Sequence, residues 1–517
     1  MSRTLLPTRT AITQFAAALT LAVCAMHGST ALAQDKVLTV GNPFAPLSMD
    51  PSLSGNGRAG THLLPAYEPL VRVRADGSFE PALATKWELS PDSRQATFTL
   101  RQGARFSDGE AVDAAAVKKS VEYWRGKKGS PFAVNLAAVT SIDVLDPSRV
   151  RFTLSAPNPA FVNLFEAYWL SGDIISPKAL ANPDSLAKET FGAGPYKLDP
   201  AATVTGKTYT YVPNPHYYDK SRIKWDKIVL SVFEDQNSAI QAMKAGQLKL
   251  LVSDPVTGFA NRDKLAKNMR MVTDPVQWTG LIIADRAGVV NPALKDVRVR
   301  QAINYAIDRK LISKALLGDF AQPTDQLQGK GFLGHDPANE AKYPFDPAKA
   351  KALLAEAGYG NGLDLKLAYV NNTLSRTMAQ VLASQFKKVG INATLNELQG
   401  FGAMLAAAAN KQFDTLLFNS NSGVPNLARF QTLAPKGSLN FYGSEDPTLS
   451  KLMDEAANVP LPQSEEAWKK VYARVVDLAW FAPIAATDTV YFATDDVKTP
   501  KIGQSVIIDL INVVPSK

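Results

Sequence analysis

The sequence has 517 residues but a single cysteine, Cys24, and only four histidines. One cysteine cannot form an intramolecular disulfide, a cysteine-based zinc site or an iron–sulfur cluster. No two histidines stand three or four residues apart, so no helix face offers a pair of histidine ligands. We therefore expect neither a metal site nor a cofactor.

Long runs of charge and long apolar runs are also missing. Lys and Arg number 56 against 48 Asp and Glu, a net charge of +8, but no five like charges stand together. The sequence therefore gives no support for nucleic-acid binding. After residue 34 no apolar stretch reaches the 18 residues or so of a membrane-spanning helix. The 46% of hydrophobic residues is ordinary for a globular protein, and the length favours two to four domains.

The first 33 residues have the pattern of a secretory signal peptide. Arg3 and Arg9 precede the apolar stretch 15–26, and an A-x-A cleavage site follows at 31–33. The apolar stretch is too short to span a bilayer as a helix. We predict that the segment is cleaved, that the mature chain starts near Gln34 without cysteine, and that the product is periplasmic.

Motifs for cofactors and catalysis fail on their context. Residues 55–60 match G-x-G-x-x-G, but no strand leads directly into them, as a dinucleotide site requires. Residues 201–208 resemble a phosphate-binding loop, but the sequence that follows has the pattern of a strand and not of a helix. There is no G-x-S-x-G nucleophile motif. The sequence thus favours binding over catalysis and names no catalytic residue, although a secreted hydrolase of esters, peptides or glycosides remains the alternative.

The body of the chain has a mixed α/β pattern. Alternation predicts strands at 97–101, 150–154, 208–212 and 227–233, and Asp113 is expected to cap a helix. From about residue 281 the pattern of expected strands and helices changes. Strands are expected at 363–367, 391–395 and 413–418, with a helix at 374–386 and another at 346–358. Strand, helix and strand in this order predict a parallel βαβ unit.

Nine short phrases, in this order along the chain, resemble the family-5 extracellular solute-binding proteins of bacterial ABC transporters, which include dipeptide, oligopeptide, glutathione and nickel binders. The phrases lie at 48–51, 67–71, 81–87, 98–109, 192–196, 214–219, 242–246, 297–309 and 346–358. The resemblance implies an α/β, two-lobed Venus-flytrap fold with an extra subdomain inserted in the first lobe. It also implies a monomer that encloses a small solute, peptide-like or otherwise polar, and delivers it to an ABC permease.

The resemblance also implies a division of the chain. We expect lobe I at 34–62, 190–277 and 486–517, the inserted subdomain at 63–189, and lobe II at 278–485. The two connections between the lobes should lie near 274–282 and 482–490. Trp278 stands at this junction and is a candidate to line the cleft, because pockets form preferentially between domains.

The predicted ligand loop departs from the pattern of peptide-binding members. Those members carry an Asp that grips the ammonium of the peptide, and Asn421 stands at that position here. A neutral amide cannot form a charge-assisted bond to an ammonium, so the resemblance to peptide binders weakens at this point. Asp414 or Asp285 could replace the missing acid. The candidate ligand contacts are Trp278, Ser420, Asn421, Ser422, Gly423, Arg429, Trp169 and Tyr67.

Overall fold

The structure is a computed structural model that describes residues 36–516, except 55–58, 75–77, 129, 131–132, 159–160, 168–171, 319–320, 422–427, 436, 438, 460–462 and 501–506. The predicted signal peptide lies outside the described residues. Residues 37–517 form one compact unit. None of the described helices is long and apolar enough to cross a membrane.

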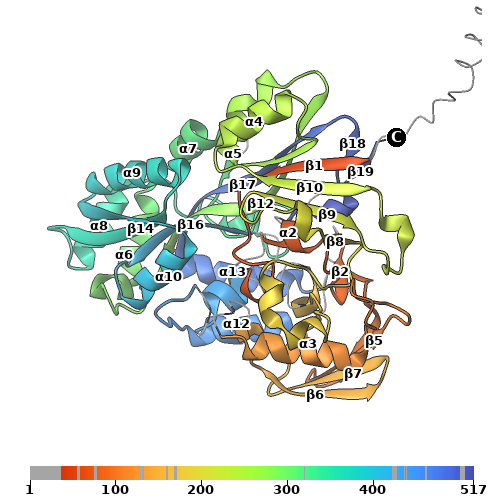
Figure 1. Cartoon of the computed structure of the whole chain (residues 1–517). Helices are drawn as coiled ribbons and strands as arrows, with labels where there is room; N and C mark the ends of the chain where they lie inside the picture. The colour runs from red at the N-terminus through yellow and green to blue at the C-terminus, as the bar shows by residue number, and fades with distance from the viewer. Residues whose placement is uncertain are drawn as a thin grey trace, which may run out of the picture. The chain divides into compact units, whose positions relative to one another are not determined.

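An 11-stranded mixed sheet is the largest element of the fold. In spatial order its strands are β15 (Ile391–Leu398), β14 (Leu363–Val370), β16 (Thr415–Asn421), β12 (Met269–Ile283), β17 (Phe481–Thr494), β11 (Leu250–Ser253), β1 (Val37–Asn42), β10 (Lys227–Val232), β9 (Thr208–Pro213) and β8 (Tyr196–Leu198), and β13 (Ala321–Pro323) pairs with β17 off this path. Figure 1 shows β12 and β17 at the centre, with β14 and β16 to one side and β1 and β10 to the other.

Smaller sheets complete the strands. A four-stranded sheet has the order β4 (Ala84–Leu89), β5 (Gln95–Leu100), β7 (Arg149–Leu154) and β6 (Val139–Asp146), and the two-stranded sheets are β2 (Val71–Val73) with β3 (Phe79–Pro81) and β18 (Val497–Lys498) with β19 (Val514–Pro515). The four-stranded sheet and α3 lie together at the bottom of Figure 1.

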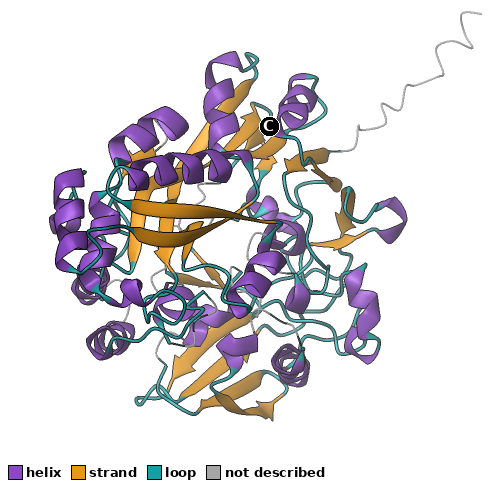
Figure 2. Cartoon of the chain, turned by 90° about the vertical axis from the view of Figure 1, so that its left-hand side faces the viewer, coloured by secondary structure: helices purple, strands orange, loops and turns teal. Residues whose placement is uncertain are grey.

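Helices flank the strands (Figure 2). They are α2 (Gly60–Leu63), α3 (Ala114–Gly126), α4 (Gln236–Lys244), α5 (Pro255–Asn261), α6 (Val297–Tyr305), α7 (Arg309–Ile312), α8 (Pro347–Glu356), α9 (Thr373–Lys387), α10 (Phe401–Ala409), α12 (Pro447–Ala457) and α13 (Glu465–Asp477). Polar caps start many of them, since a side-chain oxygen satisfies the otherwise unpaired amides of the first turn. Asp113 accepts a hydrogen bond from the amide of Ala116 at 2.8 Å, and Asn372 accepts one from the amide of Ser375 at 2.8 Å.

Several sequence predictions are confirmed at this level. Asp113 caps α3 as expected. The predicted βαβ unit is β14, α9 and β15, in which Leu363 pairs with Ile391 in parallel register. As expected, residues 201–208 do not form a phosphate-binding loop. Gly206 has a positive φ of 80° in a tight turn that leads into the strand β9.

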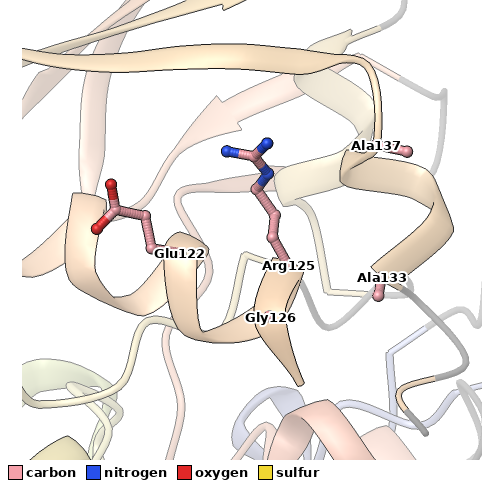
Figure 3. A pocket seen from close by; sticks show the side chains of 5 residues that line it. All are labelled: Glu122, Arg125, Gly126, Ala133 and Ala137. Carbon is pink, nitrogen blue, oxygen red and sulfur yellow. The ribbon is translucent and has the colours of Figure 1, made fainter. Parts of the chain in front are cut away.

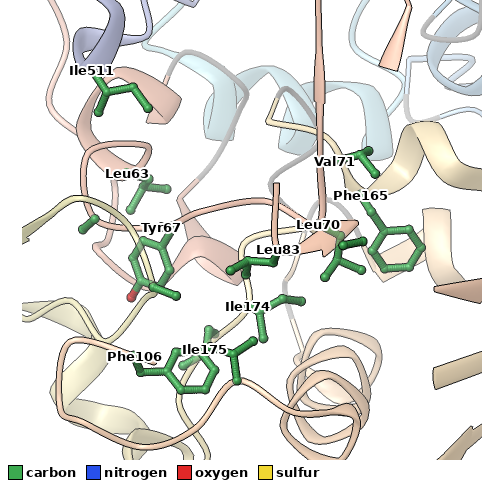
Figure 4. Close-up of a cluster of buried hydrophobic side chains, with 14 of the residues drawn as sticks. Leu63, Tyr67, Leu70, Val71, Leu83, Phe106, Phe165, Ile174, Ile175 and Ile511 are labelled. Atoms are coloured by element: carbon green, nitrogen blue, oxygen red, sulfur yellow. The ribbon is translucent and has the colours of Figure 1, made fainter. Parts of the chain in front are cut away.

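Each half of the large sheet belongs to different apolar cores. Alternate residues of β12, β14 and β16 face two opposite cores: one contains Leu281, Leu367 and Leu417, and the other contains Ile282 and Leu416. The strands on the far side of β17 pack into a third core that also includes the four-stranded sheet. Figure 4 shows part of this third core. The boundary predicted at 62–63 lies within α2, and one core continues on both sides of it. The division of the chain stays a prediction.

A buried ion network holds the first half together. The fully buried carboxylate of Glu68 accepts hydrogen bonds from Arg72 Nε at 3.2 Å and Nη2 at 2.8 Å. It also accepts from the hydroxyls of Tyr217 at 3.0 Å and Tyr218 at 2.9 Å. A buried carboxylate costs free energy unless donors satisfy its oxygens, and here they do. Segments 67–71 and 214–219 are far apart in the chain, and this contact joins them.

Glycines make a second long-range contact in this half, between Ala66 and residues 192–194. A Cβ on Gly192 would lie 2.3 Å from the carbonyl oxygen of Ala66, and one on Gly194 would lie 2.5 Å from the carbonyl carbon of Ala66. The amide of Gly194 donates to that same oxygen at 2.9 Å. Only glycine fits so close an approach of two backbones.

We expect the Glu68→Gln substitution to lower the free energy of unfolding by about 3–5 kcal/mol, because Arg72 would lose the nearer of its two acidic partners in a buried site and keep only Asp509 at 3.5 Å. The matched control is Glu80→Gln, which removes an exposed ion pair to Arg74 at 3.3 Å and should cost less than about 1 kcal/mol. Urea denaturation of both variants measures the difference. Equal, small losses would show that the Glu68 network does not hold this half together.

Candidate functional site

At one level of the sheet β12 gains the outer neighbour β16, and β17 changes its outer neighbour from β13 to β11. Residues 277–283 of β12 pair with β16, whereas residues 490–493 of β17 pair with β11. Between these two regions the β12–β17 register shifts, because Asp274 pairs with Thr489 and Gln277 with Thr487. A bulge of this kind bends a strand and interrupts its ladder. The sheet therefore passes from one set of cores to another within a few residues, inside both predicted connections.

Strand register decides which predicted site residues share a face. Trp278 pairs with Ser420, and Gln277 pairs with Asn421. Directly paired residues lie on the same face of a sheet, and successive residues lie on opposite faces. Trp278 and Ser420 are therefore on one face and Asn421 is on the other.

Trp278 lies in an apolar core. Its side chain is 3% exposed, and its ring meets that of Phe481 edge to face with centroids 5.7 Å apart. Both rings belong to the core on the side of α12 and α13. The contacts of Trp278 in this structure are packing contacts, and its contact with a ligand stays a prediction.

Neutral polar side chains gather on the other face. Asn419 Nδ2 donates to Gln277 Oε1 at 2.9 Å, and Gln277 Nε2 donates to Thr489 Oγ1 at 3.2 Å. Asn421 pairs with Gln277 on one side, and Thr487 pairs with it on the other. Asn419 is exposed, whereas Asn421, Thr487 and Thr489 are buried. These residues separate the apolar core around Leu281 from the core that contains Tyr491.

The polar set continues along the edge of the sheet. Asn371 and Gln399 follow β14 and β15 directly, and Asn371 Nδ2 donates to Gln399 Oε1 at 3.1 Å. The parallel strands β14, β15 and β16 all present their carboxyl ends here. Open α/β sheets bind ligands at that edge. We call the set the amide row, and it consists of Gln399, Asn371, Asn419, Asn421 and Gln277, with Thr487 and Thr489 at its β17 end.

Most residues of the amide row were not among the contacts predicted from the sequence. Of its members only Asn421 was among the predicted contacts. The others are ordinary polar residues at the ends of strands, and no local pattern brings them together. The alternation of Asn419 with Asn421 in one strand was the one available indication.

The two acids considered as replacements for the missing Asp lie at the wrong end of the strands. Asp414 precedes β16 and Asp285 follows β12, whereas Asn421 ends β16. Asn421 lies seven positions after Asp414, roughly 23 Å of strand at 3.3 Å per residue. Asp285 accepts from the amides of Val289 and Val290, each at 2.7 Å. These acids therefore serve local structure and cannot replace an acid at position 421.

Asp414 has a perturbed acidity that fits this structural role. Burial raises its pKa to about 6, against the lowering effect of hydrogen bonds from Asn291 Nδ2 at 3.0 Å and the amide of Lys366 at 2.9 Å. A carboxyl that titrates near neutrality is a candidate acid or base. Here its oxygens are engaged with the backbone of β14 and with the segment between β12 and α6.

Arg429 is engaged with an acid. Its Nη2 lies 2.5 Å from Asp454 Oδ1, and its side chain is 19% exposed. Burial lowers its pKa, while the charge of Asp454 opposes that shift. The guanidinium thus contacts α12, and its contact with a ligand stays a prediction.

Of the remaining candidates, Tyr67 is fully buried and three lie outside the described residues. The Tyr67 hydroxyl accepts from the amide of Phe191 at 3.3 Å, and burial raises its pKa. Its ring packs in the core shown in Figure 4 and is not exposed to solvent. The contact of Tyr67 with a ligand therefore stays a prediction. Trp169, Ser422 and Gly423 are the three outside the described residues.

A buried arginine positions the segment that follows the predicted ligand loop. Arg286 Nη2 donates to the carbonyl of Thr432 and to Asn440 Oδ1, both at 3.1 Å. Its guanidinium stacks over the ring of Trp480 at 4.4 Å. Burial, and secondarily the charge of Arg300, lowers its pKa to about 9. A guanidinium held in this way fixes the chain after residue 427 against the end of β12.

No group of three His, Cys, Asp or Glu side chains that could hold a metal occurs among the described residues. His62 is 1% exposed, and its ring meets that of Tyr209 edge to face at 5.0 Å. Burial lowers its pKa to about 3. His335 Nε2 contacts Glu340 Oε1 at 2.8 Å, away from the amide row. These two histidines thus act in packing and local pairing.

A surface hollow of about 390 Å³ lies beside α3, the helix next to the four-stranded sheet. Glu122, Arg125, Gly126, Ala133 and Ala137 line it (Figure 3). None of these residues belongs to the strands that carry the amide row. The hollow is therefore separate from the candidate site.

Comparison with known proteins finds solute-binding proteins. Residues 78–437 match the family described as bacterial extracellular solute-binding proteins, family 5 middle. The nickel-binding periplasmic protein of Escherichia coli is 27% identical over 474 residues, which cover 84% of this chain and 86% of that protein. The glutathione-binding protein GsiB of Salmonella paratyphi A is 28% identical over 373 residues, which cover 71% of this chain and 70% of that protein.

Solved structures agree. The periplasmic binding protein AgaA of A. tumefaciens, in complex with agropinic acid, has a TM-score of 0.81 and 25% identity, and the match covers 93% of this chain and 99% of AgaA. The periplasmic binding protein DppA of Helicobacter pylori, in complex with a peptide, has a TM-score of 0.80 and 23% identity, with 93% and 98% covered. The predicted two-lobed periplasmic-binding fold is confirmed.

We expect Trp278→Ala to lower the free energy of unfolding of the unliganded protein by about 3–5 kcal/mol, because it removes a large ring from a packed core. Trp278→Phe keeps an aromatic contact with Phe481 and should cost clearly less. Urea denaturation measures both. A loss below about 1 kcal/mol for Trp278→Ala, together with weaker ligand binding, would mean instead that the ring lines the site.

His62 should make stability depend on pH. Its folded pKa of about 3 lies below the ordinary value of 6.5, so the unfolded chain binds the proton first as the pH falls. The stability of the wild type relative to His62→Phe is therefore expected to fall below pH 6.5 by up to about 1.4 kcal/mol per pH unit. Urea denaturation from pH 8 to pH 4 measures this difference. Parallel curves for the two proteins would contradict the burial of a neutral imidazole.

Proposed function

This chain belongs to family 5 of the bacterial extracellular solute-binding proteins, and from that premise we propose that it captures one small polar solute between two lobes in the periplasm. It delivers the solute to the membrane subunits of an ABC permease. The protein makes and breaks no bond. Its export depends on the signal peptide at residues 1–33.

The partner exchange in β12 and β17 is the observation that carries this proposal. We assign lobe I to 34–62, 190–277 and 486–517, its inserted subdomain to 63–189, and lobe II to 278–485. Both lobe changes then fall between the two register shifts of this pairing, one between Asp274 and Gln277 and the other between Thr279 and Gly280. A few residues at strand bulges can absorb the change in backbone angles that a hinge requires. A ligand that touches both lobes favours the closed state.

The ligand contacts are proposed on the lobe II side of this hinge. Asn421 and Ser420 end β16, and Ser422 and Gly423 follow them in the chain. Arg429, Trp278, Trp169 and Tyr67 are retained as further candidates. Lobe I presents Phe44, which is 49% exposed and follows the carboxyl end of β1.

The similar proteins do not give the ligand of this chain. Their names and structures record nickel, glutathione, agropinic acid and a peptide. These ligands differ from one another, and only about a quarter of the residues are identical. No one of these ligands can therefore be assigned to this chain from similarity. The chain's own residues must decide, and position 421 offers an amide where peptide binders offer a carboxylate.

A hydrolase has no support among these relatives. A binding protein should show a rise in melting temperature with its ligand, because a ligand that binds only the folded state stabilises it, and it should show no turnover. Sustained release of product from esters, peptides or glycosides by the purified protein would overturn the binding function.

We expect the wild type not to prefer a free dipeptide over its N-acetylated form, because the amide of Asn421 offers no charge to an ammonium. Asn421→Asp should create such a preference of roughly tenfold to a hundredfold, equivalent to about 1.5–3 kcal/mol. Isothermal titration calorimetry measures both. Asn410→Asp, an exposed change just after α10, is the matched control.

Two results would count against this role of position 421. One is micromolar binding of the free dipeptide by the wild type that is lost on acetylation. The other is an equal gain of preference in Asn421→Asp and in Asn410→Asp, which would trace the effect to net charge and not to the site.

A further inference from the structure

The amide row indicates a class of ligand, an inference that rests on the function proposed above. We infer that the row, which joins carboxamides and hydroxyls from five neighbouring strands at one edge of the sheet, binds an uncharged, hydroxyl-rich solute such as a sugar chain or glycoside. The supporting observations are the charge of the row, the chemistry of its groups, its length and the apolar surface beside it.

The middle of the row, from Asn419 to Thr487, carries no charge, and charged residues stand at its two ends. Asp274 pairs with Thr489 at one end, and Gln399 Nε2 donates to Glu397 Oε1 at 3.4 Å at the other. Segments 415–428, 275–284 and 478–487 include no Asp, Glu, Lys or Arg. Asp488 follows Thr487 in β17, and strand alternation directs it to the opposite face.

The nearest charges on the β15 side form a pair. Arg376 Nε lies 2.9 Å from Glu397 Oε2, and Arg376 Nη2 lies 3.1 Å from Glu397 Oε1. A second donor, the hydroxyl of Tyr369, lies 3.0 Å from the same carboxylate. These contacts lower the pKa of Glu397, with Arg376 the larger cause, and so keep the pair ionised and neutral in sum. Arg376 Nη2 also donates to Asn371 Oδ1 at 2.7 Å, so the pair lies at the β15 end of the row. A charged ligand would therefore meet no counter-charge along the middle of the row.

The groups of the row match hydroxyls better than they match ions. Each carboxamide presents both N–H donors and an oxygen acceptor, and each threonine hydroxyl both donates and accepts. An ammonium can only donate, and a carboxylate can only accept, so either would leave half of such groups unmatched. A sugar hydroxyl donates and accepts at once. Buried polar groups that lose their partners cost free energy, which makes the match a source of specificity.

The length of the row suits an extended ligand. It reaches from Gln399 after β15 to Thr489 in β17, across four gaps between neighbouring strands. At about 4.8 Å for each gap this is roughly 19 Å. A molecule that contacts the whole row must be longer than a single sugar ring. Asn371, Gln399 and Asn419 are exposed at this edge and present their amides to solvent.

Lobe I adds two exposed apolar side chains, one of them aromatic. Phe44 is 49% exposed and Leu47 is 81% exposed, and both follow the carboxyl end of β1. Sugar rings carry an apolar face of C–H groups as well as a rim of hydroxyls. An aromatic ring on one lobe and amides on the other provide for both faces of such a ligand.

The test uses the mature chain, stripped of bound ligand by unfolding and refolding. The mature chain lacks cysteine, so no disulfide complicates refolding. The probes are maltotriose, cellotriose and the neutral trimer of N-acetylglucosamine. Charged counterparts are the deacetylated trimer, which is cationic, and trigalacturonate, which is anionic. Alanyl-alanine, its N-acetyl amide and nickel complete the panel. Melting temperature and isothermal titration calorimetry are the readouts.

The expected result is micromolar binding of at least one neutral sugar, with at least tenfold weaker binding of the charged trimers. Asn419→Asp keeps the size of the side chain, replaces its donors with acceptors and adds a charge at an exposed position. This variant should lose at least tenfold in affinity for the neutral sugar and gain affinity for the cationic trimer. Asn410→Asp should change neither affinity.

Other outcomes overturn the inference. Binding of the dipeptide, its blocked form, nickel or a charged trimer, with no response to any neutral sugar, would reject the ligand class and leave solute capture intact. Sugar binding that Asn419→Asp leaves unchanged would reject the amide row as the site. If no probe in the panel changes the melting temperature, both the ligand class and the proposed capture fail.

Discussion

The antiparallel pairing of β12 with β17 is the constraint on which the rest of the described structure depends. It runs from Met269 and Thr494 to Ile282 and Phe481, and it joins the β14–β16 side of the sheet to the β1–β11 side. Because both strands change their outer neighbours at one level, each side of the sheet has its own apolar cores. In the proposed closure, the backbone hydrogen bonds on either side of the register shift persist while the shift absorbs the motion.

The buried contacts of the first half explain why short phrases far apart in the sequence recur together. Glu68 lies in one phrase and its partners Tyr217 and Tyr218 lie in another, while Gly192 and Gly194 press against Ala66. These residues stabilise the scaffold and do not define a ligand. The phrases therefore identify the family well and say little about what is bound, whereas the amide row is built from residues outside them.

Much of the fold was predictable from sequence, and little of the site was. The helix α9 and the strands β14 and β15 follow from local periodicity and from caps such as Asn372, which act within a few residues. Trp278 was placed in the site because it falls at the predicted junction, and Asn421 because it stands at the position of the Asp of peptide binders. Their faces depend on the pairing of Gln277 with Asn421, a contact between residues 144 positions apart that no local pattern encodes. The same holds for Arg286, whose partners lie in the segment at 432–440.

The central claim is that the two sides of the sheet close on a ligand about the β12–β17 register shift. Single-molecule energy transfer tests it most directly, with dyes on Gln247→Cys, after α4, and Lys387→Cys, at the end of α9, both exposed and in a mature chain without other cysteines. With the ligand identified by calorimetry, the account predicts a second population of different transfer efficiency that grows with occupancy. One unchanged distribution at saturating ligand would contradict it.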